Sequence, residues 1–121
     1  MYDKPLVLSN IYFDFDKYDL LPESFNELDK LYNLISKMQN IQISIHGHTD
    51  SLGTQMYNML LSGYRARSVA SYLVQKGVNP DLISFSGFGF SKPVTSNLTP
   101  EGRQKNRRVE FILTRQTVNE E

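Results

Sequence analysis

Two histidines and an aspartate stand at alternate positions where an apolar, strand-like segment runs into a polar loop. They are His46, His48 and Asp50 in the run IHGHTD. Alternate residues of a strand point to the same face, and imidazole and carboxylate groups are ligand types of zinc and iron sites. A further ligand would have to come from elsewhere, because these are the only histidines in the chain. A metal-dependent hydrolase that uses these three residues is therefore one hypothesis.

Other catalytic and phosphate-binding motifs are absent from the sequence. The chain has no cysteine, which excludes thiolate nucleophiles, thiolate metal sites and disulfides. No GxSxG run is present, so no serine is placed as in a nucleophile elbow. The run GFGFSKP holds two glycines but lacks the GK[ST] of a phosphate-binding loop. The sequence therefore favours binding over nucleophilic catalysis.

A second group of polar residues could hold a zwitterion. At about 100° per residue, Arg65 and Asn58 lie together on the rim of the apolar face of a predicted helix. A guanidinium held at such a rim needs an acceptor, and a carboxylate elsewhere in the chain would satisfy it. Alternatively, Asp50 and Arg65 bind the ammonium and the carboxylate of a free amino-acid end, with Asn58 as a further donor and acceptor. In that clamp the two opposite charges face a cleft without neutralising each other.

The elements that would position these residues alternate between strand and helix. Period-2 apolar patterns predict strands at 10–16, 41–46, 82–87 and 108–114. Apolar residues at three- and four-residue steps predict amphipathic helices from Pro22 through Met38 and from about Thr54 to Lys76, the second ending at Gly77. The stretch 87–102 is predicted to be mostly loop. The order βαβαβ-loop-β predicts an α/β domain with both helices on one face of the sheet.

Size, charge and hydropathy indicate one soluble globular domain. Of the 121 residues 40% are hydrophobic and 21% charged, a composition typical of folded chains. The 13 basic and 13 acidic residues balance, and the basic cluster at 103–108 is short, so no nucleic-acid partner is predicted. The longest apolar runs are too short to insert into a membrane. We expect a single domain over 1–121, with its core at about 8–114 and a frayed tail at 116–121.

Three longer runs resemble a known family. They are IHGHTDSLGTQMYNMLLSGYRARSVASYLVQKGV, FSGFGFSKPVTSN and TPEGRQKNRRVEF, and the opening NIYFDFDKYDLLPES is similar as well. In these runs GHTD, YN..LS..RA and NRRVE stand at spacings that resemble the OmpA-like C-terminal domain, the family of peptidoglycan-associated lipoproteins and flagellar stator proteins. The resemblance covers about residues 8–114. It implies a two-layer α+β sandwich with a mixed sheet and two main helices on one face.

The resemblance also implies a function and a site. Family members bind peptidoglycan noncovalently, without catalysis, metal or cofactor, through the free end of meso-diaminopimelate in the stem peptide. The matching residues here are Asp50 and Arg65, with supporting contacts from Asn58, Leu61, Phe15, Asp16 and Arg107. Phe15 stands where many members have a smaller residue.

We therefore expect a domain, typically C-terminal in a larger envelope protein, that anchors this protein to the cell wall in the periplasm, tethered to the outer membrane. Secretion or motility machinery could be a partner through the parent protein. Two alternatives stay open at this point. One is a metal-dependent hydrolase that acts on cell-wall peptides through His46, His48 and Asp50. The other is a protein–protein interaction module.

Overall fold

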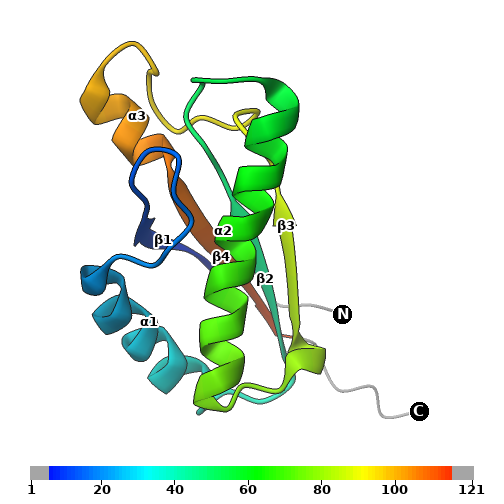
Figure 1. The fold of residues 1–121 in the computed structure, drawn as a ribbon. Coiled ribbons are helices and arrows are strands. Elements are labelled where there is room, and N and C mark those ends of the chain that lie inside the picture. The colour runs from blue at the N-terminus through cyan, green and yellow to red at the C-terminus, as the bar shows by residue number, and fades with distance from the viewer. Residues whose placement is uncertain (1–5, 116–121) are drawn as a thin grey trace.

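Residues 6–115 are described by a computed structural model, in which four strands form one mixed sheet in the order β1-β4-β2-β3 (Figure 1). Helices α1 and α2 cover one face of this sheet, and a short helix, α3, lies at the end of the sheet where β4 begins. The fold class and the two main helices on one face are confirmed, whereas the predicted tail at 116–121 lies outside the described residues. The elements are β1 (Leu6–Tyr12), α1 (Pro22–Ile35), β2 (Ile41–Gly47), α2 (Gln55–Lys76), a 3-10 turn η1 (Pro80–Leu82), β3 (Ile83–Gly87), α3 (Pro100–Asn106) and β4 (Arg108–Arg115).

The sheet is mixed because one pair of neighbouring strands runs parallel and the other two pairs run antiparallel. Strands β2 and β3 run parallel, with Ile45 opposite Phe85, and α2 supplies the long connection that a parallel pair requires. Strand β4 runs antiparallel to both of its neighbours, β1 and β2. This arrangement brings the carboxyl ends of β1 and β2 and the start of β4 to the same end of the sheet.

The core lies between the helices and the inner face of the sheet. Along β2, Ile41, Ile43 and Ile45 are buried and alternate with half-exposed residues, as the period-2 pattern predicts. Helix α1 buries Leu28, Leu31 and Ile35 but leaves Phe25 40% exposed, although its spacing predicted burial. The helix ends at Ile35, and Met38, predicted to be its last apolar residue, packs against the core from the following turn.

Helix α2 lies unusually close to the sheet. A Cβ added to Gly47 would stand 2.0 Å from the backbone oxygen of Ser62 on α2, so a side chain at this position would push the helix away. The helix begins after Thr54, whose side chain accepts the Tyr57 N–H, and ends at Gly77 with φ 120°. A positive φ of this kind is tolerated by glycine, so the predicted helix end is confirmed. No helix among residues 6–115 is long and apolar enough to cross a membrane.

Strand β1, which begins at Leu6 rather than at residue 10, and the segment before β4 differ further from the predictions. Strand β1 ends at Tyr12 rather than at residue 16, because its ladder with β4 stops at the pair Tyr12–Arg108 and Asp16 takes a left-handed φ of 62°. The stretch predicted to be loop contains α3. This helix is too short and polar to show an apolar period, but Thr99 caps it and Pro100 opens it, and both are sequence signals of a helix start.

Candidate functional site

One pocket lies at the end of the sheet where β1 and β2 finish. Its volume is about 390 Å³, and its walls come from the β1–α1 loop, the β2–α2 loop, the first half of α2 and the residue after α3. Every residue predicted to bind the zwitterion lines this pocket, although they come from distant parts of the chain, whereas His46 and His48 of the hydrolase hypothesis do not line it. The lining residues are Phe15, Asp16, Thr49, Asp50, Leu52, Gly53, Tyr57, Asn58, Leu61, Arg65 and Arg107.

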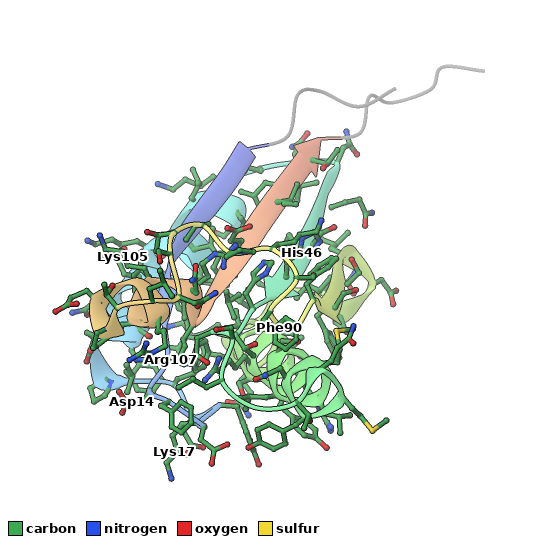
Figure 2. All side chains as sticks on the ribbon, turned by 90° about the horizontal axis from the view of Figure 1, so that it is seen from above. Asp14, Lys17, His46, Phe90, Lys105 and Arg107 are labelled. Atoms are coloured by element: carbon green, nitrogen blue, oxygen red, sulfur yellow. The ribbon has the colours of Figure 1, made fainter. Side chains whose placement is uncertain are left out.

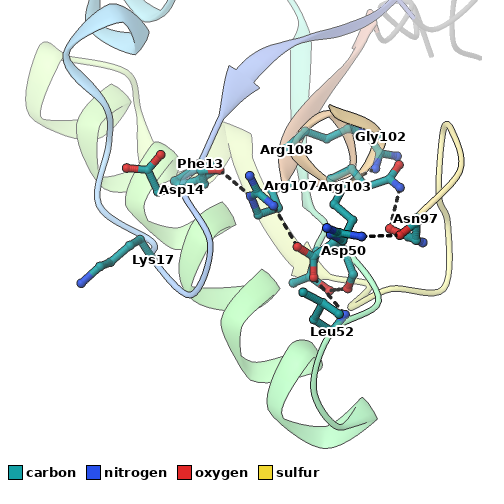
Figure 3. Close-up of polar contacts among 12 residues, drawn as sticks. Phe13, Asp14, Lys17, Asp50, Leu52, Asn97, Gly102, Arg103, Arg107 and Arg108 are labelled. Atoms are coloured by element: carbon teal, nitrogen blue, oxygen red, sulfur yellow. Dashed lines mark hydrogen bonds and ion pairs between the residues drawn. The ribbon is translucent and has the colours of Figure 1, made fainter. Parts of the chain in front are cut away.

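Asp50 is a buried carboxylate with defined partners on both oxygens. It is 2% exposed. Its Oδ1 accepts the Leu52 N–H at 3.0 Å, and its Oδ2 accepts from Nη1 of Arg107 at 3.0 Å (Figure 3). The sequence predicted that Asp50 and Arg65 do not neutralise each other, but it did not predict that Asp50 forms an ion pair with another residue. Its partner is Arg107, and Asp50 and Arg65 do not form an ion pair with each other.

Arg107, the residue that precedes β4, is hydrogen-bonded to the segment that follows β1. Its Nε donates to the carbonyl of Phe13 at 3.0 Å, while the backbone N–H of Phe13 donates to the Arg107 carbonyl at 3.0 Å. Figure 3 shows the guanidinium lying between Phe13 and Asp50, and the Asp14 side chain turned away from it. Arg107 thus fixes the start of the β1–α1 loop against the carboxylate of the β2–α2 loop.

Arg65 lies deeper than the predicted rim position, because it is 0% exposed. Its guanidinium donates to three backbone carbonyls: Nε to Lys17 at 2.7 Å, Nη1 to His48 at 3.0 Å and Nη2 to Asp14 at 2.9 Å. The Lys17 side chain points away from the pocket (Figures 2 and 3), whereas the Phe13 ring lies beside the guanidinium, its centroid 5.1 Å from Cζ of Arg65. Within residues 6–115 no carboxylate forms a salt bridge with Arg65, which removes the alternative of an internal carboxylate partner in that part of the chain.

The charge on Arg65 is costly in this position. Burial, and next the neighbouring guanidinium of Arg107, lower the pKa of Arg65 to about 10, while the carboxylates of Asp50 and Asp16 act against this shift. The side chain remains a cation at neutral pH. Three of the five N–H groups of a guanidinium are used by the carbonyls, so two N–H groups have no partner among the described residues.

Asn58 has a structural task that its position on the helix did not reveal. Its Nδ2 donates to the carbonyls of Leu52 and Thr54, at 2.9 and 3.0 Å, and so ties the β2–α2 loop to the first turn of α2. Leu61 is one turn further along and 6% exposed. Tyr57 lines the pocket on the same side of α2 and was not predicted, although it stands four residues before Leu61, a spacing that brings helical side chains together.

The outer rim of the pocket is formed by exposed residues. The Tyr57 hydroxyl donates to the carboxylate of Asp16 and so links α2 to the β1–α1 loop. Phe15, predicted to lie in a strand, lies beyond the end of β1 and is 54% exposed. Thr49, Leu52 and Gly53 also line the pocket without having been predicted. The run between Asp50 and Asn58 could have indicated them, since a loop between two site residues borders the same space.

His46 and His48 do not join Asp50 in a metal site. Strand β2 ends at Gly47, so the alternation that would align the three side chains stops before Asp50. Both rings pack against Phe88, with centroids 4.7 and 5.5 Å away, whereas Asp50 points into the pocket. Within residues 6–115 no group of three His, Cys, Asp or Glu residues is arranged to hold a metal ion. The geometry of these residues therefore does not support the hydrolase hypothesis.

Arg108 belongs to a different network from Arg107. Its Nε donates to Glu110 at 2.8 Å, and its Nη atoms donate to the carbonyls of Asn106 and Lys92. Neighbouring residues at a strand start point in opposite directions, which predicted that at most one of these arginines serves the cleft. Only Arg107 lines the pocket.

Comparison with known proteins gives a consistent result. A sequence model of the OmpA family matches residues 12–107. The chain is similar to outer membrane protein A of Bordetella avium, with 45% identity over 87% of this chain and 54% of that protein. It is 40% identical to the peptidoglycan-binding protein ArfA of Mycobacterium tuberculosis, over 85% of this chain and 32% of that protein. The chain thus spans about half of the first relative and about a third of the second.

A solved structure agrees with this likeness. The peptidoglycan-associated lipoprotein from Burkholderia pseudomallei superimposes with a TM-score of 0.81 at 29% identity, over 85% of this chain and 87% of that one.

Proposed function

We propose that this chain, which belongs to the OmpA family, binds peptidoglycan noncovalently. It thereby anchors a larger envelope protein to the cell wall. The ligand is the free amino-acid end of diaminopimelate in the stem peptide. The observation that carries this proposal is the buried guanidinium of Arg65, which has N–H donors left and no carboxylate partner within residues 6–115. A buried cation of this kind is stabilised when a ligand brings a carboxylate.

The charges in the pocket favour a zwitterion over a simple anion or cation. Its ionisable lining residues are Arg65, Arg107, Asp50 and Asp16, two positive and two negative at neutral pH. A ligand with one ammonium and one carboxylate leaves this balance unchanged. The ammonium binds at Asp50, whose carboxylate can accept beyond its bonds to Leu52 and Arg107, and the ligand carboxylate binds at Arg65.

The same proposal covers location and catalysis. A domain of this kind acts in the periplasm, bound to peptidoglycan and tethered to the outer membrane through its parent protein, with secretion or motility machinery as one partner of that parent. Relatives carry names such as outer membrane protein and peptidoglycan-binding protein. The pocket binds and does not catalyse, because the Asp50 carboxylate is engaged by Arg107 and Leu52, the Asp16 carboxylate accepts from the Tyr57 hydroxyl, and no activated nucleophile is among the lining residues.

The test compares Asp50→Asn with wild type. Asparagine keeps the shape and can still accept the Leu52 N–H, but it removes the charge that faces the ammonium. We expect affinity for a diaminopimelate tripeptide to fall by about 2–5 kcal/mol in isothermal titration calorimetry, and the variant to stop pelleting with purified sacculi. Asp81→Asn, an exposed change in η1, is the matched control and should behave as wild type.

Removing the positive charge from the ligand tests the same contact as removing the negative charge from Asp50. A tripeptide whose free diaminopimelate amine is acetylated should bind wild type as weakly as the unmodified peptide binds Asp50→Asn. Equal affinity of Asp50→Asn and wild type for the unmodified peptide would refute the clamp. Absence of binding to both sacculi and peptide by wild type would instead favour the protein–protein interaction module.

A further inference from the structure

A second hollow lies beside the pocket, between α1, α2 and the loop before α1. We call it the aromatic groove. Its volume is about 490 Å³, and four of its lining residues are aromatic: Tyr18, Phe25, Tyr64 and Tyr72. Tyr18, Phe25 and Tyr64 are 48%, 40% and 45% exposed. The rings form two pairs, Tyr18 with Tyr64 and Phe25 with Tyr72, whose centroids are 5.2 and 5.3 Å apart.

The lining of this groove suits sugar rings. A pyranose has an apolar C–H face that packs on an aromatic ring, and hydroxyl or amide groups at its edge that need hydrogen-bond partners. Tyrosine offers an apolar ring with a polar end, and Arg67 and Gln75 place further donors along the same side of α2. The groove also holds one acidic and one basic residue, Asp19 and Arg67, so its charges balance and an uncharged polar ligand that hydrogen-bonds to them suits this surface.

The groove and the pocket share one wall. Asp16 lines the pocket and Tyr18 lines the groove, so the short segment between them separates the two. This segment is fixed to α2 by hydrogen bonds: Arg65 Nε donates to the Lys17 carbonyl at 2.7 Å, and Ser68 Oγ donates to the Tyr18 carbonyl at 2.9 Å. A ligand that extends from the pocket over this wall therefore contacts a segment whose backbone is held in place by hydrogen bonds to α2.

The spacing of the two sites matches the dimensions of the polymer. Along α2 the groove begins at Tyr64, three residues after Leu61 of the pocket, and reaches Gln75, and the rise of about 1.5 Å per residue puts its lining residues roughly 5 to 20 Å beyond Leu61. In peptidoglycan the diamino acid stands only a few residues from the glycan. A few extended residues at about 3.3–3.6 Å each, with the diamino acid side chain added, span a comparable distance.

We propose that the aromatic groove binds the glycan strand to which the bound stem peptide is attached. This inference rests on the proposed function, since the pocket must first hold the peptide end. The domain then contacts peptidoglycan at two linked points, and the second contact raises the effective affinity because the peptide already holds the sugar close to the groove.

The experiment compares a disaccharide-bearing diaminopimelate muropeptide with the same stem peptide freed of its sugar, both titrated into wild type, Tyr64→Ala and Leu60→Ala. Alanine at 64 removes one ring of the groove and keeps a good helix former. Leu60→Ala is the matched control, because Leu60 is 56% exposed on α2 and lines neither the pocket nor the groove. We expect the sugar to improve binding to wild type and Leu60→Ala by about three- to tenfold, and Tyr64→Ala to lose this gain while binding the bare peptide as wild type does.

Equal binding of the two ligands to wild type would overturn the glycan assignment and leave the proposed function standing. A sugar gain that persists in Tyr64→Ala would place the sugar outside the groove and would also overturn it. Failure of both ligands to bind would instead refute the proposed function, and with it this inference. Sedimentation velocity completes the test: self-association of wild type that Tyr64→Ala abolishes would assign the groove to a second copy of the chain rather than to glycan.

Discussion

His48 makes stability depend on pH in a direction that the structure sets. Its ring is buried, with 1% of the residue exposed, and neither ring nitrogen has a hydrogen-bond partner among the described residues. Burial, and next the guanidinium of Arg108, lower the pKa of His48 to about 4. Glu110, whose carboxylate lies 3.7 Å from Nε2, acts against this shift, whereas His46 and Lys92 reinforce it. The folded protein therefore holds this ring neutral.

The magnitude follows from the difference between the folded and unfolded states. Well above pH 6.5, the ordinary pKa of histidine, the ring is neutral in both states and contributes nothing to pH dependence. Below that value the unfolded chain binds the proton first, so stability is lost as the pH falls, until the folded pKa of about 4 is passed. The loss amounts to about 1 kcal/mol at pH 5.5 and on the order of 2–3 kcal/mol at pH 4.5.

The assay is urea unfolding of wild type and His48→Leu at pH 7.5, 5.5 and 4.5, followed by circular dichroism. Other groups titrate in both proteins, so the quantity of interest is the difference between their free energies of unfolding at each pH. Leucine has a similar size and removes two unpaired polar atoms, so the variant should be at least as stable as wild type at pH 7.5. The difference in its favour should then grow on acidification by the amounts given above.

A pH-independent difference between the two proteins would refute this reasoning. It would mean that the folded protein accepts the proton on His48 as readily as the unfolded chain does, for example by pairing the imidazolium with Glu110. His46→Leu is the useful comparison, because His46 also has a lowered pKa but is only half-buried. It should remove less of the acid sensitivity than His48→Leu.

Three further variants test how the pocket and its supports are built. Arg65→Met removes three hydrogen bonds to backbone carbonyls and should lower the free energy of unfolding by about 2–4 kcal/mol even without ligand, and an unchanged urea midpoint would contradict this structural role. Gly47→Ala forces a Cβ towards the Ser62 carbonyl and should lower the free energy of unfolding by about 1–3 kcal/mol. Gly63→Ala meets nothing within 4 Å and should raise the Tm. Equal Tm values of the two variants would show that α2 moves away from the sheet without cost. Asn106→Ala leaves the backbone N–H of Val94 without its acceptor, and hydrogen exchange in residues 94–97 should become faster, whereas unchanged protection there would show that another group holds the loop.

Part of the site could be predicted from helical phase, whereas Phe15, Asp16 and Arg107 were indicated by the family resemblance alone. The period of α2 put Asn58, Leu61 and Arg65 on one side of a helix, and the structure shows them lining one pocket. The depth of Arg65 could not be predicted in the same way. Its acceptors are carbonyls 17, 48 and 51 residues away in sequence, and a backbone carbonyl leaves no trace in the pattern of side chains.

The differences between prediction and structure have similar causes. The pairing of Asp50 with Arg107 joins residues 57 apart in sequence, and charge alone did not select Arg107 over the other arginines of its run. The early end of β1 follows from where its partner strand starts and from the left-handed φ of Asp16. Helix α3 has too few residues for an apolar period, so only its N-cap Thr99 and the following Pro100 could have indicated it.

The hydrogen bond between Arg107 and Phe13 makes completion of the pocket depend on pairing of the last strand. It joins residues 94 apart in sequence, and the same guanidinium orients the carboxylate of Asp50. A chain still emerging during synthesis or transport, with its last strand not yet paired between β1 and β2, has the aspartate but not the group that aligns it. Under the proposed function, attachment to the wall is a late event that follows completed folding, and a chain cut short before residue 107 would remain unattached.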